Sequence, residues 1–258
     1  MLIGWTTGVN SSDSTWSYWL KSSEELRQLT NIVQLHIQDH APLVRLEGDL
    51  ISKVRFLHPP KGGRLDTLEV LAARIEAVLM QYEFSRPVIV LHPPALRDED
   101  ALVKTIVDRA IGLVRLLERW SISVGIEITG DVPNDERFLR KFEEILKTAS
   151  ASGNIGVILD TEHEVHKGTD LPALASKYKS LVIGVHVKDY DGHPFETNGK
   201  RRFVRYGTGI VDFRAVFASV DVNRIPLILE GNYGKLTDLI EDLYLVRTDA
   251  SIALESRR

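Results

Sequence analysis

Residues 155–160 read IGVILD, and this stretch decides the fold, because an apolar run of strand length ends here at an acid, Asp160. Three further stretches have the same form: SVGIEI (123–128) with Glu127, VIGVHVKD (182–189) with His186, and PLILEG (226–231) with Glu230. A carboxylate or imidazole at the edge of a core is costly unless something pairs with it. Four such groups at equivalent positions indicate one shared partner, and a divalent metal ion is the simplest candidate.

Eight short apolar runs are predicted as strands, and most are rich in Val, Ile and Leu, as is typical of parallel strands covered on both faces. They are 2–7, 32–38, 54–58, 87–92, 122–128, 155–160, 182–188 and 226–230. Segments with helical periodicity lie between them, which predicts a parallel sheet with right-handed crossovers. Eight units in 258 residues favour an α/β fold of the (β/α)8 TIM barrel type, with residues 1–258 as a single domain. An open doubly wound sheet is disfavoured, since no glycine-rich turn follows the first strand.

Two helix starts carry local signals. Ser22 followed by Glu25 is a capping box that predicts a helix at about 23–30. Asp212 is predicted to begin the helix that contains Phe213. The longest stretch without helix or strand signals is 190–209, and long loops in compact domains are usually functional or mobile.

The composition excludes several classes of protein. A net charge of −4 argues against a general nucleic-acid binder, and the absence of cysteine rules out disulfides and thiolate metal sites. The first residues lack the basic and apolar regions of a signal peptide, and no apolar run approaches membrane-spanning length. We therefore expect a cytoplasmic protein whose partner is a small molecule rather than nucleic acid or a membrane. Whether it forms a homo-oligomer stays open.

Further polar groups are expected at the carboxyl ends of the strands, which form the active face of a barrel. His36, His58 and His92 each end a predicted strand, and His163 follows Asp160 by three residues. Lys188 lies two residues after His186 and so shares its strand face, although it could instead point outward or pair with Asp189. We interpret these groups as follows: His58 and His92 as ligands of a second metal or of substrate, and His163, Lys188, Trp5 and His36 as substrate-binding candidates. For Trp5 and His36 a core role is the ordinary alternative.

With these residues in order, the chain resembles the xylose isomerase-like barrel superfamily, in particular its endonuclease IV branch and its sugar phosphate isomerases and epimerases. The motifs that carry the resemblance are FLH58, LH92PP, IE127, D160TEH163, H186VKD189, G207TG209 and LILE230. They extend over nearly the whole chain. The resemblance implies a metal cage of Glu127, Asp160, His186 and Glu230 that holds one divalent ion, Mn²⁺, Mg²⁺, Co²⁺ or Zn²⁺.

The chain departs from the endonuclease pattern at one place. That branch carries Asp-x-His just before its Gly-x-Gly turn as ligands of a third zinc, whereas Arg201 and Phe203 stand there in this sequence. Neither residue can replace those ligands, so the trinuclear cluster is expected to be broken. The arginine that the ketose epimerases place after the histidine that matches His186 also has no clear equivalent.

The resemblance implies a metal-dependent sugar or sugar-phosphate isomerase or epimerase, in which Glu127 and Glu230 transfer the proton. The first alternative is a metal-dependent hydrolase related to abasic-site endonucleases, supported by His58 and His92. The second alternative is a barrel without catalytic activity that binds a polyol. One fold serves several reactions, so the motifs fix the superfamily more firmly than the activity.

Overall fold

The computed structural model describes residues 1–6, 18–19, 22–37, 52–59, 67–81, 84, 86–94, 96, 98–128, 136–149, 154–193, 195–197 and 202–257. Its eight strands are all parallel and close into a barrel in chain order, with β8 pairing back onto β1. This confirms the predicted TIM barrel. The strands are β1 Ile3–Thr6, β2 Ile32–His36, β3 Val54–His58, β4 Val88–Leu91, β5 Ser123–Ile128, β6 Ile155–Asp160, β7 Val182–Val187 and β8 Leu227–Leu229.

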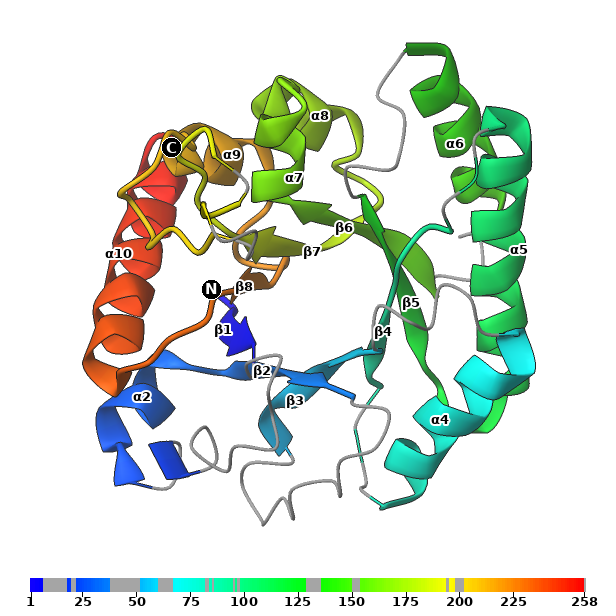
Figure 1. The fold of residues 1–258 in the computed structure, drawn as a ribbon, viewed down its shortest axis with the longest axis horizontal. Helices are drawn as coiled ribbons and strands as arrows, with labels where there is room; N and C mark the ends of the chain where they lie inside the picture. The colour runs from blue at the N-terminus through cyan, green and yellow to red at the C-terminus, as the bar shows by residue number, and fades with distance from the viewer. Residues whose placement is uncertain are drawn as a thin grey trace.

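Helices surround the ring of strands (Figure 1). Within the described ranges, all of them except the short 3₁₀ helix η2 are α-helices. They are α2 Glu24–Leu29, α4 Leu68–Gln81, α5 Glu99–Leu116, η2 Glu118–Trp120, α6 Glu136–Ala149, α7 Thr161–His166, α8 Leu171–Lys177, α9 Phe213–Ser219 and α10 Leu236–Glu255. None of the helices in the described ranges combines the length and the apolar character needed to cross a bilayer.

The apolar side chains form two cores. The larger one lies between the strands and the helices, and the smaller one fills the inside of the barrel. Five buried residues make up the inner core: Ile32, Phe56, Val90, Ile158 and Ile228. Space there is tight: a Cβ on Gly125 would come within 2.4 Å of Cδ1 of Ile158. The glycine therefore leaves room for the larger side chain of the neighbouring strand.

The inner core explains where the polar side chains lie. Residues two apart on a strand share a face, so the residue two positions after each inner-core residue also points into the barrel, closer to its carboxyl end. Those residues are Gln34, His58, His92, Asp160 and Glu230. An apolar layer thus supports a polar layer at the mouth.

One predicted helix start is confirmed and the other is wrong by one residue. Asp212 caps α9, because its side chain accepts a hydrogen bond from the Ala215 amide. Helix α2 is capped by Ser23 rather than Ser22, since the Ser23 hydroxyl accepts from the Leu26 amide at 3.1 Å. The Ser22 hydroxyl instead donates to the carbonyl of Tyr18.

The described part of the segment after β7 is fixed to the barrel by a buried carboxylate. Asp189 accepts hydrogen bonds from the amides of Tyr190, Gly209 and Val211 at 2.8, 2.8 and 3.2 Å. A Cβ on Gly209 would lie 2.3 Å from Oδ1 of Asp189, so the close approach needs glycine. Asp189 therefore serves the backbone rather than Lys188.

Candidate active site

The four predicted metal ligands meet inside the mouth of the barrel and are almost fully buried. The exposed fractions are 2% for Glu127, 0% for Asp160 and His186, and 7% for Glu230. They come from β5, β6, β7 and the residue after β8. The barrel brings the carboxyl ends of these strands together although the residues lie far apart in sequence.

The imidazole of His186 links the two glutamates. Its Nδ1 lies 3.0 Å from Oε1 of Glu127 and 3.4 Å from Oε1 of Glu230. Its Nε2 lies 2.9 Å from Oε1 of Gln34, a fully buried side chain on β2. The two glutamates therefore converge on one ring nitrogen.

Lys188 links the other carboxylates. Its Nζ lies 2.7 Å from Oδ2 of Asp160 and 2.5 Å from Oε2 of Glu230. Its backbone is held by Thr161, whose hydroxyl accepts from the Lys188 amide at 2.9 Å. Asp160 is held as well, because its Oδ1 accepts from the His163 amide and so caps α7. The ammonium is thus fixed between two predicted metal ligands.

Three histidines line the other side of the mouth. Ring centroids of His36 and His58 are 4.2 Å apart, and those of His58 and His92 are 4.6 Å apart. Nε2 of His92 lies 2.8 Å from Oε2 of Glu127, and Nε2 of His58 lies 3.8 Å from the same oxygen. Burial lowers the pKa of His36 to about 4 and lowers the pKa of His58 well below its usual value. His36 and His58 are therefore neutral at pH 7, the form in which an imidazole can bind a metal.

The charged groups stabilise one another's ionised forms. Burial alone would raise the pKa of Glu127, but His92 and His186 hold it well below its usual value. Burial opposes ionisation of Glu230 in the same way, and His186 and Lys188 hold its pKa below the usual range. In turn, burial would lower the pKa of His186 and of Lys188, yet the surrounding carboxylates raise both. Both glutamates are therefore ionised at neutral pH.

The donor set fits a divalent cation. One ligand atom each from Glu127, Asp160 and His186 lies within 4.8 Å of the others. Among the residues that the structure describes, two further groups of this kind occur at the mouth, His58–His92–Glu127 and His36–His58–Glu230. Oε2 of Glu127 is buried and, among the described residues, accepts no well-directed hydrogen bond, although His92 is close to it. Three carboxylates carry three negative charges and Lys188 carries one positive charge, so one divalent ion would balance the site.

Of the predicted substrate-binding residues, the structure brings Lys188, His36 and His163 to this cluster and not Trp5. Nε2 of His163 lies 4.0 Å from Oδ2 of Asp160, and its side chain is 17% exposed. Trp5 belongs to the outer core, where its ring packs against Trp19. Thr6, the next residue of β1, contacts Gln34 inside the barrel, so Trp5 must point the other way.

Sequence reasoning missed Gln34. This side chain contacts Glu230 and His186 from the middle of the apolar run IVQLH. The available signal was its spacing, because an amide two residues before His36 shares the face of that histidine. A polar residue on a buried strand face needs a partner there.

Phe203 is one of the two residues at which the sequence departs from the endonuclease pattern, and the structure describes its surroundings. Phe203 packs edge-on against Tyr233, with ring centroids 5.1 Å apart, and against Gly231. It offers no metal ligand. Arg201 lies outside the described residues.

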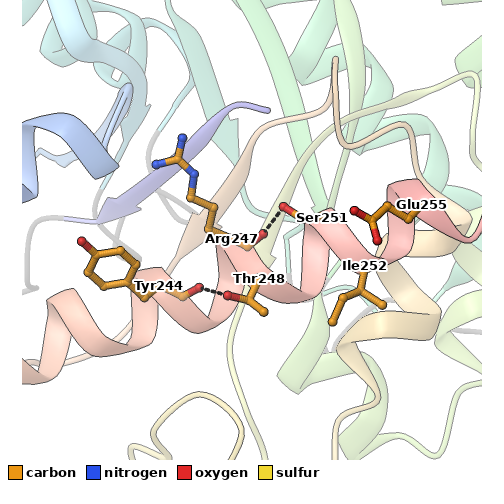
Figure 2. Close-up of a pocket in the computed structure, with 6 residues that line it drawn as sticks. All are labelled: Tyr244, Arg247, Thr248, Ser251, Ile252 and Glu255. Atoms are coloured by element: carbon orange, nitrogen blue, oxygen red, sulfur yellow. Dashed lines mark hydrogen bonds between the residues drawn. The ribbon is translucent and has the colours of Figure 1, made fainter.

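A hollow of about 340 Å³ lies on the surface of α10 (Figure 2). Its lining comes from one helix: Tyr244, Arg247, Thr248, Ser251, Ile252 and Glu255. The hydroxyls of Thr248 and Ser251 donate to backbone carbonyls of their own helix. These two hydroxyl protons are therefore already used within the helix and are not offered to a ligand.

Comparison with known proteins places this geometry in a family. Solved structures with the same fold include an L-ribulose 3-epimerase (15% identity, TM-score 0.68, covering 99% of this chain and 95% of that chain). They also include an IOLI protein with a bound zinc atom (17% identity, TM-score 0.68, 99% of both chains). A third is the 3-keto-D-glucoside 4-epimerase YcjR from E. coli (15% identity, TM-score 0.63, 96% of this chain and 99% of that chain).

At these identities the structural likeness establishes the fold alone. No curated protein sequence matches the chain significantly. The sequence profile of the xylose isomerase-like TIM barrel family, by contrast, matches residues 9–247. The chain therefore belongs to the xylose isomerase-like TIM barrel family.

Proposed function

We propose that this protein is a metal-dependent sugar or sugar-phosphate isomerase or epimerase, with Glu127 and Glu230 as the proton-transfer pair. The observation that carries the proposal is the contact of both carboxylates with one imidazole nitrogen, at 3.0 and 3.4 Å from Nδ1 of His186. A substrate carbon held near that point would lie within reach of both carboxylates. Inversion or proton relay at a carbon needs this arrangement, since one group removes the proton and the other returns it.

Glu127, Asp160, His186 and Glu230 would hold the divalent ion. When bound, such an ion acts as a Lewis acid that polarises a substrate carbonyl and makes the neighbouring C–H more acidic. The ion in the IOLI structure is zinc, which supports this kind of site without fixing the metal here.

The protein's own side chains supply the remaining steps. Glu230 or Glu127 accepts the proton in its ionised form, and the low pKa of each keeps it ready at neutral pH. Proton transfer by positioned carboxylates contributes roughly 10²–10⁴-fold to the rate. Lys188 and His163 donate hydrogen bonds to substrate oxygens at the mouth. Burial of the cluster keeps bulk water from returning the proton indiscriminately.

Proton exchange with solvent tests this function directly. Candidate ketoses and aldoses, free and phosphorylated, are incubated with the protein in D₂O together with Mg²⁺, Co²⁺, Mn²⁺ or Zn²⁺, and loss of the substrate C–H signal is followed by proton NMR. Samples that contain paramagnetic metal are chelated before the spectrum is taken. Glu230→Gln is expected to fold and to lose most of the exchange. Wild-type exchange in that variant would rule out the proton-transfer role.

A second candidate is a phosphodiester hydrolase with two metal ions. It is supported by His58, His92 and Glu127, whose ligand atoms lie within 4.8 Å of one another. Efficient incision of abasic duplex DNA by the purified protein would favour it over the isomerase. Metal and polyol binding with neither incision nor C–H exchange would favour the non-catalytic barrel.

A further inference from the structure

Gln34 is a buried amide at the centre of the candidate site. Its side chain is 0% exposed and lies in the interior of the barrel, two residues after Ile32 on β2 and on the same strand face. Its Oε1 lies 2.9 Å from Nε2 of His186, and its Nε2 contacts Oε1 of Glu230. A weaker contact of 3.4 Å joins the same Nε2 to Oγ1 of Thr6. A single side chain therefore touches a predicted metal ligand and a predicted proton-transfer group.

The chemistry of the amide fixes the direction of these bonds. An amide oxygen only accepts and an amide NH₂ only donates. Glu230 is paired with the ammonium of Lys188 and is ionised, so it can only accept. The NH₂ of Gln34 must therefore face Glu230, which turns its oxygen toward His186. The reverse orientation would set an amide oxygen against a carboxylate oxygen.

This orientation determines which nitrogen of His186 carries a proton. The oxygen of Gln34 can only accept, so Nε2 of His186 must be protonated and donate to it. Nδ1 is then the nitrogen that faces Glu127 and Glu230. Partners of this kind, which hold a histidine through its other ring nitrogen, set its tautomer and ring orientation at metal sites.

We propose that Gln34 is a positioning residue that holds His186 with Nδ1 toward the metal cage and holds Glu230 with Oε1 fixed and Oε2 turned to the mouth. The inference rests on the proposed function for its catalytic consequence. The arrangement of the imidazole and the carboxylate can be tested without any substrate. Gln34 acts through the groups it contacts.

Two substitutions separate the two bonds. Gln34→Met keeps the length and burial of the side chain and removes both. Gln34→Glu keeps an acceptor for His186 but replaces the donor to Glu230 with a like charge. Gln28→Met serves as the control, because Gln28 donates to Glu24 at 3.0 Å on the exposed surface of α2.

The first measurement is made on the zinc-loaded protein with ¹⁵N-labelled histidine. The wild type is expected to show a slowly exchanging proton on Nε2 of His186 and Nδ1 without a proton. Gln34→Met should lose that slow exchange, whereas Gln34→Glu should keep it. An unchanged His186 Nε2 proton in Gln34→Met would overturn the proposal.

The second measurement is zinc affinity by calorimetry. Loss of such a supporting bond typically weakens metal binding 10–100-fold, so Gln34→Met should bind zinc at least tenfold more weakly. Gln34→Glu should bind at least as tightly as wild type, because it keeps the bond to His186 and adds negative charge. Gln28→Met should match wild type. A zinc affinity within twofold of wild type in Gln34→Met would contradict the positioning role.

Turnover is measured last, on whichever sugar shows C–H exchange. Both Gln34 variants are expected to lose kcat at least tenfold with KM little changed, since Glu230 is displaced in each. If no sugar exchanges, the proposed function fails, but the proton on His186 and the zinc affinity still decide the role of Gln34. A variant that loses only thermal stability and keeps all three readouts would show that Gln34 merely fills the barrel.

Discussion

Replacing Lys188 with methionine removes the one ammonium seen within contact distance of Asp160 and Glu230 in the described structure. Met retains the length and most of the apolar stem, so the change isolates the charge. Without metal, the carboxylates of Asp160 and Glu230 lose a neighbouring positive charge, so the variant should be less stable than wild type. With metal, the variant lacks the ammonium that competes for the carboxylate oxygens of Asp160 and Glu230, so the metal should bind more tightly. The two states should therefore respond in opposite directions.

The structure gives the size of the effect. At 2.7 and 2.5 Å, each ion pair has a Coulomb energy of about 6 kcal/mol at an effective dielectric constant near 20, most of which is offset by desolvation. Removing one partner of a buried pair typically costs about 3–5 kcal/mol. The side chain of Lys188 retains 20% exposure, which places the expected loss near the lower end, at about 3 kcal/mol.

Urea unfolding in the presence of a chelator measures the loss of stability, and calorimetry with Zn²⁺ or Mn²⁺ measures the gain in affinity. We expect Lys188→Met to bind the metal at least about tenfold more tightly, which corresponds to about 1.4 kcal/mol. Lys147→Met is the matched control: Lys147 pairs with Glu143 at the same 2.7 Å, but its side chain is 56% exposed. The exposed pair of Lys147 and Glu143 should contribute less than about 0.5 kcal/mol to the free energy of unfolding.

Two results would refute this reasoning. If Lys188→Met and Lys147→Met unfold at the same urea concentration without metal, the ammonium does not neutralise the buried carboxylates. If metal affinity is unchanged while stability falls, Lys188 and the metal do not compete for the same oxygens.

Three further predictions follow from other contacts. Metal added to the wild type at 100 times its dissociation constant should raise the free energy of unfolding by about 2.7 kcal/mol, and thermal melts with and without chelator check this. Asp189→Ala should lose about 3 kcal/mol of unfolding free energy in urea, because the partly buried amides of Gly209 and Val211 lose their buried acceptor. Asp189→Asn should lose less, and equal losses in the two variants would show that the negative charge of Asp189 does not matter. Burial lowers the pKa of His36 to about 4 in the folded protein, against 6.5 for the free side chain. As pH falls, the unfolded chain therefore binds this proton before the folded protein does. The free energy of unfolding should consequently decrease between pH 6.5 and pH 4. His36→Asn should reduce this fall by at most about 3 kcal/mol, measured as unfolding free energy against pH; an identical pH profile would show that His36 does not titrate in this way.

Much of the site was predictable because the barrel converts position in the chain into position in space. Glu127, Asp160 and His186 all end apolar runs, and parallel strands bring such ends to one face. The order of the strands was enough to predict that these side chains meet, without knowledge of any individual contact. The strand boundaries were found to within two residues for the same reason, since apolar runs and buried strands coincide.

The rest depended on which face of a strand a residue occupies. Parallel strands are apolar on both faces, so the run IGWT does not reveal whether Trp5 or Thr6 points inward. The role of Gln34 was missed for the same reason, because its partners His186 and Glu230 lie on distant strands and the run IVQLH does not indicate them. Likewise, Ser22 and Ser23 both suit a helix start, and only the hydrogen bond to Leu26 distinguishes them.

The charge balance of the mouth explains why these side chains occur together. Without metal, the surrounding carboxylates raise the pKa of His186 and so favour its protonated form. With that proton, the three carboxylates, Lys188 and His186 sum to one net negative charge. A divalent ion bound through nitrogen requires His186 to give up the Nδ1 proton, and the sum then becomes zero. The proton on Nε2 must stay for that exchange to occur at the correct nitrogen, and Gln34 is the acceptor that keeps it there. Lys188 contributes its positive charge to both sums, but its contacts with Asp160 and Glu230 stabilise the empty site and compete with the metal for the same oxygens.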